Sequence, residues 1–271
     1  MAVHTPARLG LVPLHPADSG SRDHPLFLHL AGLLGARGVV VDRYDRRAAA
    51  PGRDVPLADQ AADARAAMAR LRDRYHVQVG LWGFSQGAWA AALAASEDQA
   101  TAFLITVAAC GVSPALQMRY GTREQLRRAG YETAELDVLR ETYERYVRGE
   151  LNRDEAQTVV DRAATRPWFD HAWVPRQLPQ AGSWPDMDFD PQEVIARVRC
   201  PVLAIWSAMD EWVPVDESIA RWHPAGPLTV VKLPDTTHEP SPSPLYESEI
   251  CRFLDAIRLP GRSHVEYRGA G

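Results

Sequence analysis

The feature that most restricts the fold of this chain is a repeated alternation of short apolar runs with longer helical segments. The apolar runs are bounded by turn residues, and we predict that they form six strands: Leu9–Leu14, Val39–Asp42, Val77–Trp82, Ala102–Val107, Val202–Trp206 and Leu228–Leu233. Because the hydrophobicity within each run is continuous, we expect strands buried on both faces, as in a parallel sheet. Helical spacing of apolar residues occurs between the strands, at Leu26–Ala36, Leu57–Tyr75, Gln86–Ser96, Val215–Trp222 and Leu245–Ile257. The pattern predicts an α/β fold with a doubly wound, mostly parallel sheet.

The alternation stops over residues 111–190, where no convincing strand occurs. Amphipathic helices are predicted there near Arg123–Ala129, Ala134–Arg148 and Arg153–Ala164, followed by an aromatic and proline-rich segment. An unstructured loop of this length is uncommon in a compact domain, so we predict an inserted helical lid. The predicted organisation is a first core part at 1–110, the lid at 111–190, a second core part at 191–259 and a flexible tail at 260–271.

Composition excludes several other classes of protein. The chain has 271 residues, of which 46% are hydrophobic, so it can bury a core. With 30 basic and 35 acidic residues it lacks the basic surface that binds nucleic acid, and no apolar window approaches the roughly 18 residues of a membrane span. The three cysteines are widely spaced, which favours neither a disulfide framework nor a zinc site. The N-terminal segment does not resemble a secretion signal, so we expect a cytoplasmic protein.

The pentapeptide Gly83-Phe84-Ser85-Gln86-Gly87 is the strongest chemical signal in the sequence. It directly follows a predicted strand and directly opens a predicted helix of small residues. A serine in this strand–turn–helix setting is typical of a nucleophile elbow, in which glycines on either side allow the strand and the helix to approach closely. The alternative is an ordinary glycine-rich connection without chemistry.

A nucleophilic serine needs a base to accept its proton and an acid to orient that base. Asp210 follows the predicted strand that ends at Trp206, and His238 follows the next strand, so both lie at strand carboxyl ends. We therefore predict a triad of Ser85, His238 and Asp210. Glu211 and then Asp216 are the substitutes for the acid, and helix-capping or solvated roles remain as alternatives for His238 and Asp210.

Several segments together resemble the α/β-hydrolase superfamily over nearly the whole chain. They are the first strand ending in His15-Pro16, the segment 19–23, the strand with VVVDRYDRR, the GFSQG turn, the loop SAMDEWVP and the loop PDTTHEP. Within the superfamily the chain looks most like bacterial acyl hydrolases related to dienelactone hydrolases and prolyl-oligopeptidase-type domains. The resemblance implies an α/β-hydrolase fold, an oxyanion hole and no cofactor, and no metal-binding or dinucleotide-binding motif occurs in the sequence.

Two motifs depart from the pattern of these relatives. Their His-Gly pair is His15-Pro16 here, and their Arg-Arg-Gly motif is Arg46-Arg47-Ala48. The resemblance assigns one oxyanion amide to Gln86. Proline has no N–H, so the second amide is assigned to Ala17.

The start of the chain differs as well, because relatives carry further strands before the first strand found here. A sheet that lacks them has an exposed edge, which a second copy of the chain would cover as a homodimer.

By analogy with these relatives, the expected reaction is hydrolysis of a carboxylic ester, thioester or lactone through an acyl-enzyme. The alternatives are a peptidase, an acyl-transfer or cyclising enzyme of a biosynthetic pathway, and a non-catalytic binder. The expected partner is a small-molecule acyl substrate. Four lid aromatics either form the lid's own core or favour an apolar or aromatic acyl group: Trp168, Phe169, Trp173 and Trp184.

Overall fold

The structure is a computed structural model, and the residues that it describes are 9–240, 243–258 and 267–268. Within these residues one sheet has the strand order β2-β1-β3-β4-β5-β6-β7, and every neighbouring pair is parallel. The strands are β1 Leu9–Leu14, β2 Val39–Val41, β3 Gln78–Phe84, β4 Leu104–Val107, β5 Val202–Ser207, β6 Leu228–Leu233 and β7 Tyr267–Arg268.

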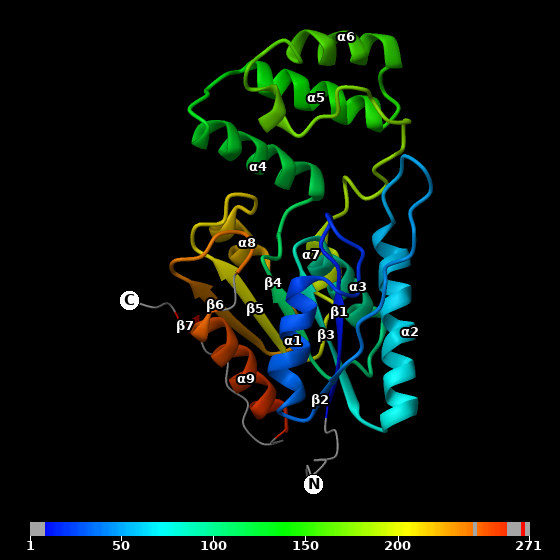
Figure 1. The fold of residues 1–271 in the computed structure, drawn as a ribbon, viewed down its shortest axis with the longest axis vertical. Coiled ribbons are helices and arrows are strands. Elements are labelled where there is room, and N and C mark those ends of the chain that lie inside the picture. The colour runs from blue at the N-terminus through cyan, green and yellow to red at the C-terminus, as the bar shows by residue number, and fades with distance from the viewer. Residues whose placement is uncertain (1–8, 241–242, 259–266, 269–271) are drawn as a thin grey trace.

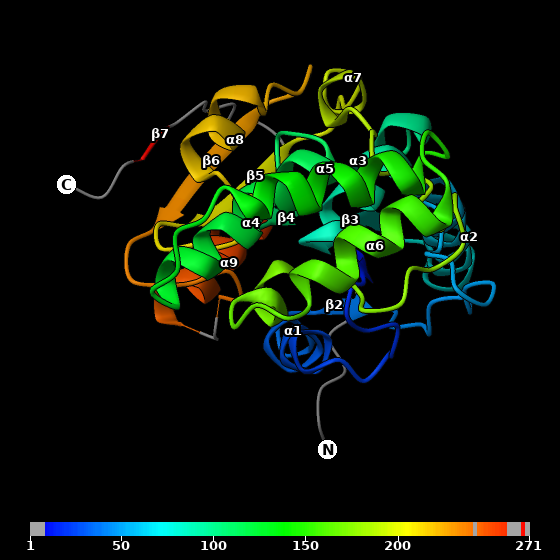
Figure 2. The same cartoon turned by 90° about the horizontal axis from the view of Figure 1, so that it is seen from above.

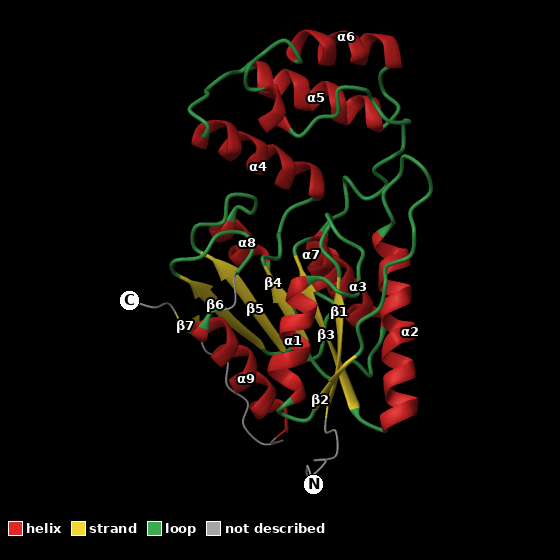
Figure 3. Ribbon diagram, viewed as in Figure 1, coloured by secondary structure: helices red, strands yellow, loops and turns green. Residues whose placement is uncertain are grey.

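Helices cover both faces of this sheet (Figures 1 and 3). The core helices are α1 Pro25–Gly35, α2 Leu57–Tyr75, α3 Gln86–Glu97, α7 Pro191–Ile195, α8 Val215–Arg221 and α9 Pro244–Arg258. One apolar cluster joins α1 and α9 to the sheet, and a second joins α2, α3, α7 and α8 to it. The predicted doubly wound α/β fold is therefore confirmed, and the sheet is parallel throughout its described part.

One edge of the sheet differs from the prediction. Tyr267 and Arg268, which were assigned to a flexible tail, form β7 and pair with Val230 and Val231 of β6. The pairing gives β6 a neighbour on a side where its backbone N–H and C=O groups would otherwise be unpaired. The composition of the tail did not indicate this strand. The remainder of the predicted tail lies outside the described residues. At the other edge β2 has no outer neighbour among the described strands.

Between β4 and α7 the chain forms four helical elements: α4 Pro114–Arg128, α5 Glu135–Val147, α6 Arg153–Ala163 and the short 3₁₀ helix η1 Phe169–Ala172. They stand beyond the carboxyl ends of the strands and lie over the sheet when it is viewed from above (Figures 1 and 2). We call residues 111–190 the helical insertion. Its helices share an apolar core that is separate from the two cores of the sheet.

The first helix of the insertion begins nine residues before the predicted start at Arg123. Ser113 caps it, because its Oγ accepts a hydrogen bond from the Leu116 N–H at 3.4 Å, and Pro114 occupies the first helical position. Both residues are typical helix-start signals. The apolar spacing alone did not reveal this first part of the helix.

The insertion leaves and re-enters the core at one place. The Ala115 N–H at the start of α4 donates to the carbonyl oxygen of Met187 at 2.9 Å. This bond joins the start of the insertion to the segment that returns to the core. Beside this contact, Asp186 accepts a hydrogen bond at 2.8 Å from the Leu57 N–H at the start of α2. The carboxylate thereby caps a core helix from a segment of the insertion.

Inside the insertion, Glu144 of α5 is fully buried and accepts two-pronged hydrogen bonds from Arg119 of α4. Arg140, also buried, lies 3.7 Å from the same carboxylate. Two guanidinium groups thus share one buried acid. Among the described helices, none combines the length and apolar character needed to cross a membrane.

Candidate active site

Ser85 occupies a sharp turn between β3 and α3. Its φ of +53° lies in the left-handed region, which a residue with a side chain adopts only at an energetic cost. The Ser85 N–H donates to the Val107 carbonyl oxygen of β4 at 2.9 Å, which fixes the turn to the neighbouring strand. The hydroxyl is therefore held at the carboxyl end of the sheet by backbone contacts.

Glycines beside Ser85 make this turn sterically feasible. A Cβ on Gly83 would collide with the Gly87 carbonyl oxygen, and a Cβ on Gly87 would lie 2.5 Å from the Leu14 carbonyl oxygen. The end of β1 thus passes directly against the start of α3. Only glycine fits at either position, as the sequence pattern indicated.

The loops after β5 and β6 bring an acid and a base to Ser85. His238 Nε2 lies 3.0 Å from Ser85 Oγ, and His238 Nδ1 lies 2.9 Å from Asp210 Oδ2 and 3.0 Å from Oδ1. Asp210 is buried, and its Oδ1 also accepts hydrogen bonds from the N–H groups of Trp212 and Val213 at 2.8 and 2.9 Å. The three predicted residues therefore form one continuous hydrogen-bonded chain.

This arrangement sets the proton positions of the imidazole. A carboxylate is an acceptor only, so Nδ1 carries the proton toward Asp210 and leaves Nε2 free to accept the Ser85 hydroxyl proton. The His238 side chain is 17% exposed, and its ring centroid lies 5.2 Å from that of Phe84. The ring is thus restrained by packing while one edge stays open toward a substrate.

The two substitute acids lie elsewhere. Glu211 accepts the backbone N–H of His238 at 3.3 Å and lies 3.8 Å from Arg128 of α4. Asp216 is exposed and pairs with Lys232 at 2.7 Å. In the structure only Asp210, among these three carboxylates, contacts the imidazole nitrogens.

The two amides assigned to an oxyanion hole lie on adjacent segments. Gln86 is the first residue of α3, and Ala17 is in the turn just after β1, whose Leu14 and His15 carbonyl oxygens approach Gly87. Neither amide donates a hydrogen bond to another residue in the described part of the chain. Both N–H groups are therefore free to serve a ligand.

Arg46 is a residue of this region whose role the sequence did not reveal. Its Nη1 donates to the Pro16 carbonyl oxygen at 3.0 Å and to Gln86 Oε1 at 3.3 Å, and its Nη2 donates to the Ala17 carbonyl oxygen at 3.3 Å. Sequence comparison marked positions 46–48 only as a departure from Arg-Arg-Gly. The available signal was topological, because β1 lies between β2 and β3 and the loop after β2 therefore runs beside the loop after β1.

His15 anchors the base of the same loop and stands apart from the proton chain. It is buried between Phe27 and Tyr44, with ring centroids 4.9 and 5.1 Å away. Burial, and then the nearby Arg46 charge, lower its pKa from 6.5 to about 4, so the ring is neutral at physiological pH. Its place in the structure is that of a packing residue.

The described residues offer neither a second activated nucleophile at Cys110 nor a metal site. Burial raises the pKa of the Cys110 thiol to about 12, which keeps it protonated and unreactive. In the described residues no group of three or more His, Cys, Asp or Glu side chains is arranged to hold a metal ion.

The aromatic residues of the insertion divide into two groups. Trp168 and Phe169 are buried in the insertion's own core, and Trp184 packs against it. Trp173 instead is 60% exposed and meets Trp212 of the Asp210 loop edge to face, with ring centroids 4.9 Å apart. One of the four aromatics therefore faces the loop that carries the acid.

Trp212 also contacts α4, because its indole fills the space that a Cβ on Gly121 would need. Other large apolar side chains on the same two elements are exposed: Leu116 and Tyr120 of α4 and Met209 of the Asp210 loop. We call Leu116, Tyr120, Trp173, Met209 and Trp212 the apolar junction.

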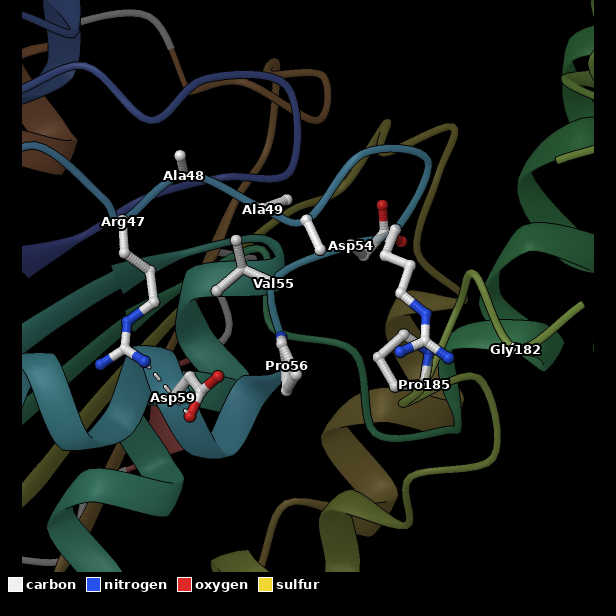
Figure 4. Close-up of a pocket in the computed structure, with 11 residues that line it drawn as sticks. Arg47, Ala48, Ala49, Asp54, Val55, Pro56, Asp59, Gly182 and Pro185 are labelled. Carbon is white, nitrogen blue, oxygen red and sulfur yellow. Dashed lines mark ion pairs between the residues drawn. The ribbon is translucent and has the colours of Figure 1, made fainter. Parts of the chain in front are cut away.

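A separate pocket of about 270 Å³ lies where the returning segment of the insertion meets the core (Figure 4). Its lining comes from the loop after β2, the start of α2 and the returning segment, including Arg47, Asp54, Asp59 and Gly182. None of Ser85, Asp210 and His238 lines it, so this pocket is distinct from the hydrogen-bonded chain.

A sequence model of the alpha/beta hydrolase family matches residues 12–255. The matched span contains all three residues of the hydrogen-bonded chain and the whole insertion. No curated protein matches this sequence significantly.

Solved structures share the fold over most of their length. GrgF, an alpha/beta hydrolase from Penicillium sp. sh18, has 18% identity and a TM-score of 0.62, with 93% of this chain and 90% of that chain covered. Est1E from Butyrivibrio proteoclasticus, solved with ferulic acid, has 16% identity, a TM-score of 0.62 and the same coverages. The esterase Pf2001 from Pyrococcus furiosus has 16% identity and a TM-score of 0.59, with 92% and 82% covered. Identities this low establish a common fold and leave the substrate open.

Proposed function

This chain belongs to the alpha/beta hydrolase family, and from that premise we propose that it is a serine hydrolase acting on a carboxylic ester, thioester or lactone. The predicted superfamily is thereby confirmed, whereas the narrower resemblance to dienelactone hydrolases stays a prediction. The proposal rests on one observation above all: the hydrogen-bonded chain from Ser85 through His238 to the buried Asp210.

In the proposed first half-reaction, Ser85 Oγ attacks the carbonyl carbon of the substrate while His238 Nε2 takes the hydroxyl proton. The carbonyl electron pair moves to oxygen, and the amides of Gln86 and Ala17 donate to that oxyanion. Asp210 stabilises the imidazolium. Collapse breaks the bond to the leaving group, which departs with the proton from His238, and the acyl group stays on Ser85.

In the second half-reaction, water replaces the alcohol or thiol. The water oxygen attacks the acyl carbon while His238 Nε2 takes a proton from the water. The resulting tetrahedral intermediate breaks its bond to Ser85 Oγ, which recovers a proton from His238. The products are a carboxylic acid and a regenerated enzyme. No step of this proposed reaction requires a cofactor.

An apolar or aromatic acyl group is the substrate feature that the apolar junction favours. Exposed Trp173 of the insertion contacts Trp212, which lies on the loop that holds Asp210, so an apolar group bound there would be close to the proposed triad. Est1E was solved with ferulic acid and Pf2001 is described as an esterase, which makes ester substrates the first to test here.

The test uses a fluorophosphonate probe together with p-nitrophenyl esters of increasing acyl chain length. We expect the protein to be labelled and to hydrolyse esters, Ser85→Ala to do neither, and the matched control Ser248→Ala to retain both. Labelling that persists in Ser85→Ala, or a parent protein that is not labelled, would contradict the proposal. Labelling without turnover of any ester would redirect the substrate search to thioesters, peptides or acyl transfer.

A further inference from the structure

The two amides assigned to the oxyanion hole belong to segments that are far apart in the sequence. The Gln86 amide is fixed by the start of α3. The Ala17 amide lies in an irregular turn, with no backbone hydrogen bond of its own among the described residues. A useful hole needs both donors aimed at one point, so something must fix the turn.

Arg46 contacts both sides of this arrangement. Its Nη1 bridges the Pro16 carbonyl oxygen and Gln86 Oε1, and its Nη2 reaches the Ala17 carbonyl oxygen. Its own backbone N–H donates to the Gly20 carbonyl oxygen at 2.8 Å, so the guanidinium and the main chain of one residue hold two points of the turn.

The geometry of the peptide unit turns these contacts into an orientation for Ala17. The Pro16 carbonyl and the Ala17 N–H belong to one planar trans peptide, in which the C=O and N–H point in opposite directions. A guanidinium bound to the Pro16 oxygen therefore directs the Ala17 N–H to the side away from Arg46. Its second contact, to the Ala17 oxygen, restrains the next peptide in the same way.

The proline at position 16 limits how the turn that carries the Ala17 amide can be held. Proline lacks an N–H, so its carbonyl oxygen is the only backbone hydrogen-bonding group by which residue 16 can be held. A planar guanidinium has several donors in fixed directions and can bind two successive carbonyl groups and a side-chain amide at once, whereas a lysine ammonium lacks this fork.

The other side of Gln86 is also restrained. Gln60, a buried residue of α2, donates from Nε2 to the Val55 carbonyl oxygen at 2.9 Å and lies 3.5 Å from Gln86 Oε1. Gly20 leaves room for the stem of Arg46, because a Cβ there would lie 3.2 Å from the arginine Cβ. The surroundings thus fix the guanidinium against both segments.

We infer that Arg46 is a positioning residue of the oxyanion hole, which sets the direction of the Ala17 amide and ties it to Gln86. This inference rests on the proposed function. Arg46 touches neither the substrate nor the reacting atoms, and it acts through the peptide that it holds.

The experiment compares Arg46→Gln and Arg46→Lys with the adjacent control Arg47→Gln. Arg47 binds Asp63 and Asp59 at the surface and makes none of the contacts to the turn. Each variant is assayed for kcat and KM on a p-nitrophenyl ester and on the matching thionoester. The sulfur of a thionoester accepts hydrogen bonds weakly, so its hydrolysis gains little from an oxyanion hole.

We expect Arg46→Gln to lower kcat on the ester by about 10- to 100-fold, less than the roughly 10²–10³ lost with a whole donor, and to leave KM within about threefold. The ratio of ester to thionoester turnover should fall with it. Arg46→Lys should recover part of the loss, and Arg47→Gln should match the parent protein.

A folded Arg46→Gln that keeps its kcat, or that loses ester and thionoester turnover equally, overturns the inference and leaves the proposed function standing. If Arg46→Gln does not fold, the ratio of ester to thionoester turnover in Arg46→Lys decides: an unchanged ratio overturns the inference, and a lowered ratio supports it. If neither variant folds, Arg46 is a folding residue and the inference is wrong. A parent protein that fails to react with fluorophosphonate overturns the proposed function itself, and the inference with it.

Discussion

The indole of Trp212 occupies the space in which Gly121 would carry a side chain. Trp212 follows Asp210 by two residues and donates its backbone N–H to the Asp210 carboxylate, while Gly121 belongs to α4 of the helical insertion. The insertion therefore rests directly on the loop that holds the acid. A change on α4 at this point reaches the proposed triad through a single residue.

Gly121→Ala tests this contact. The added methyl group has no room, so we expect the indole of Trp212 to shift. The free energy of unfolding should fall by about 1–3 kcal/mol, and kcat should fall severalfold. The matched control is Gly32→Ala in α1, where a Cβ meets no atom within 4 Å. This control should be stabilised by up to about 1 kcal/mol and keep its activity. Urea unfolding and ester turnover are measured for both variants. If Gly121→Ala matches Gly32→Ala in stability and kcat, the contact between Trp212 and α4 supports neither the fold nor the proposed triad.

Asp210→Asn tests the assignment of the acid. The asparagine oxygen can keep the Trp212 and Val213 N–H donors, which turns its NH₂ group toward His238 and favours the wrong imidazole tautomer. We expect kcat to fall on the order of 10³–10⁴-fold with little change in stability. Asp216→Asn, at an exposed carboxylate paired with Lys232, should retain full activity. A fall of less than tenfold in Asp210→Asn would rule out its role as the acid.

His15 predicts a pH dependence of stability. Its pKa is about 4 in the folded protein and 6.5 when unfolded, so the unfolded chain binds more protons between these values and stability falls as the pH drops through this window. From pH 7 to pH 5 the loss from this group is about 2 kcal/mol. His15→Asn should lose less stability over that interval than the parent protein, whereas the exposed control His223→Asn should show the parent's loss. Urea unfolding at both pH values measures the difference.

Glu144→Ala tests the buried carboxylate of the insertion. Its removal leaves Arg140 without a counter-charge inside the protein, and we expect a loss of about 3–5 kcal/mol in the stability of the insertion. Glu135→Ala breaks the exposed pair with Arg166 and should cost less than about 1 kcal/mol. Hydrogen exchange of α4 and α5 measures both. Comparable effects would mean that Glu144 and Arg140 are not energetically coupled.

Much of the fold could be predicted from the sequence because buried parallel strands and amphipathic helices leave a periodic record. Leu57–Tyr75 forms a helix with the predicted bounds, and β1 and β6 also match. The order of Ser85, Asp210 and His238 followed from the position of each residue after a strand. Their mutual distances, by contrast, depend on the strand order, in which only β4 separates β3 from β5 and β6 lies next to β5.

The features that could not be predicted produce no periodic pattern of apolar residues in the sequence. Arg46 acts mainly through the backbone carbonyl groups of residues 16 and 17. Almost every residue type offers such a carbonyl, so the amino-acid sequence at these positions does not reveal the contact. Glu144 and Arg140 look like ordinary exposed helix residues, since only tertiary packing buries them. The β7 pairing involves two residues, too few to produce a strand signal.

The hydrogen bond between Ala115 and Met187 also has a meaning for how this chain can change over time. Because the start of α4 and the returning segment already meet there, the two ends of the intervening chain are held together whatever its length. The segment from 116 to 186 can be exchanged for another helical module at little topological cost, provided that a residue equivalent to Asp186 still caps α2. A replacement module must also leave room for the Trp212 indole where α4 has Gly121, so new insertions are compatible with the site only when they preserve these two contacts with the core.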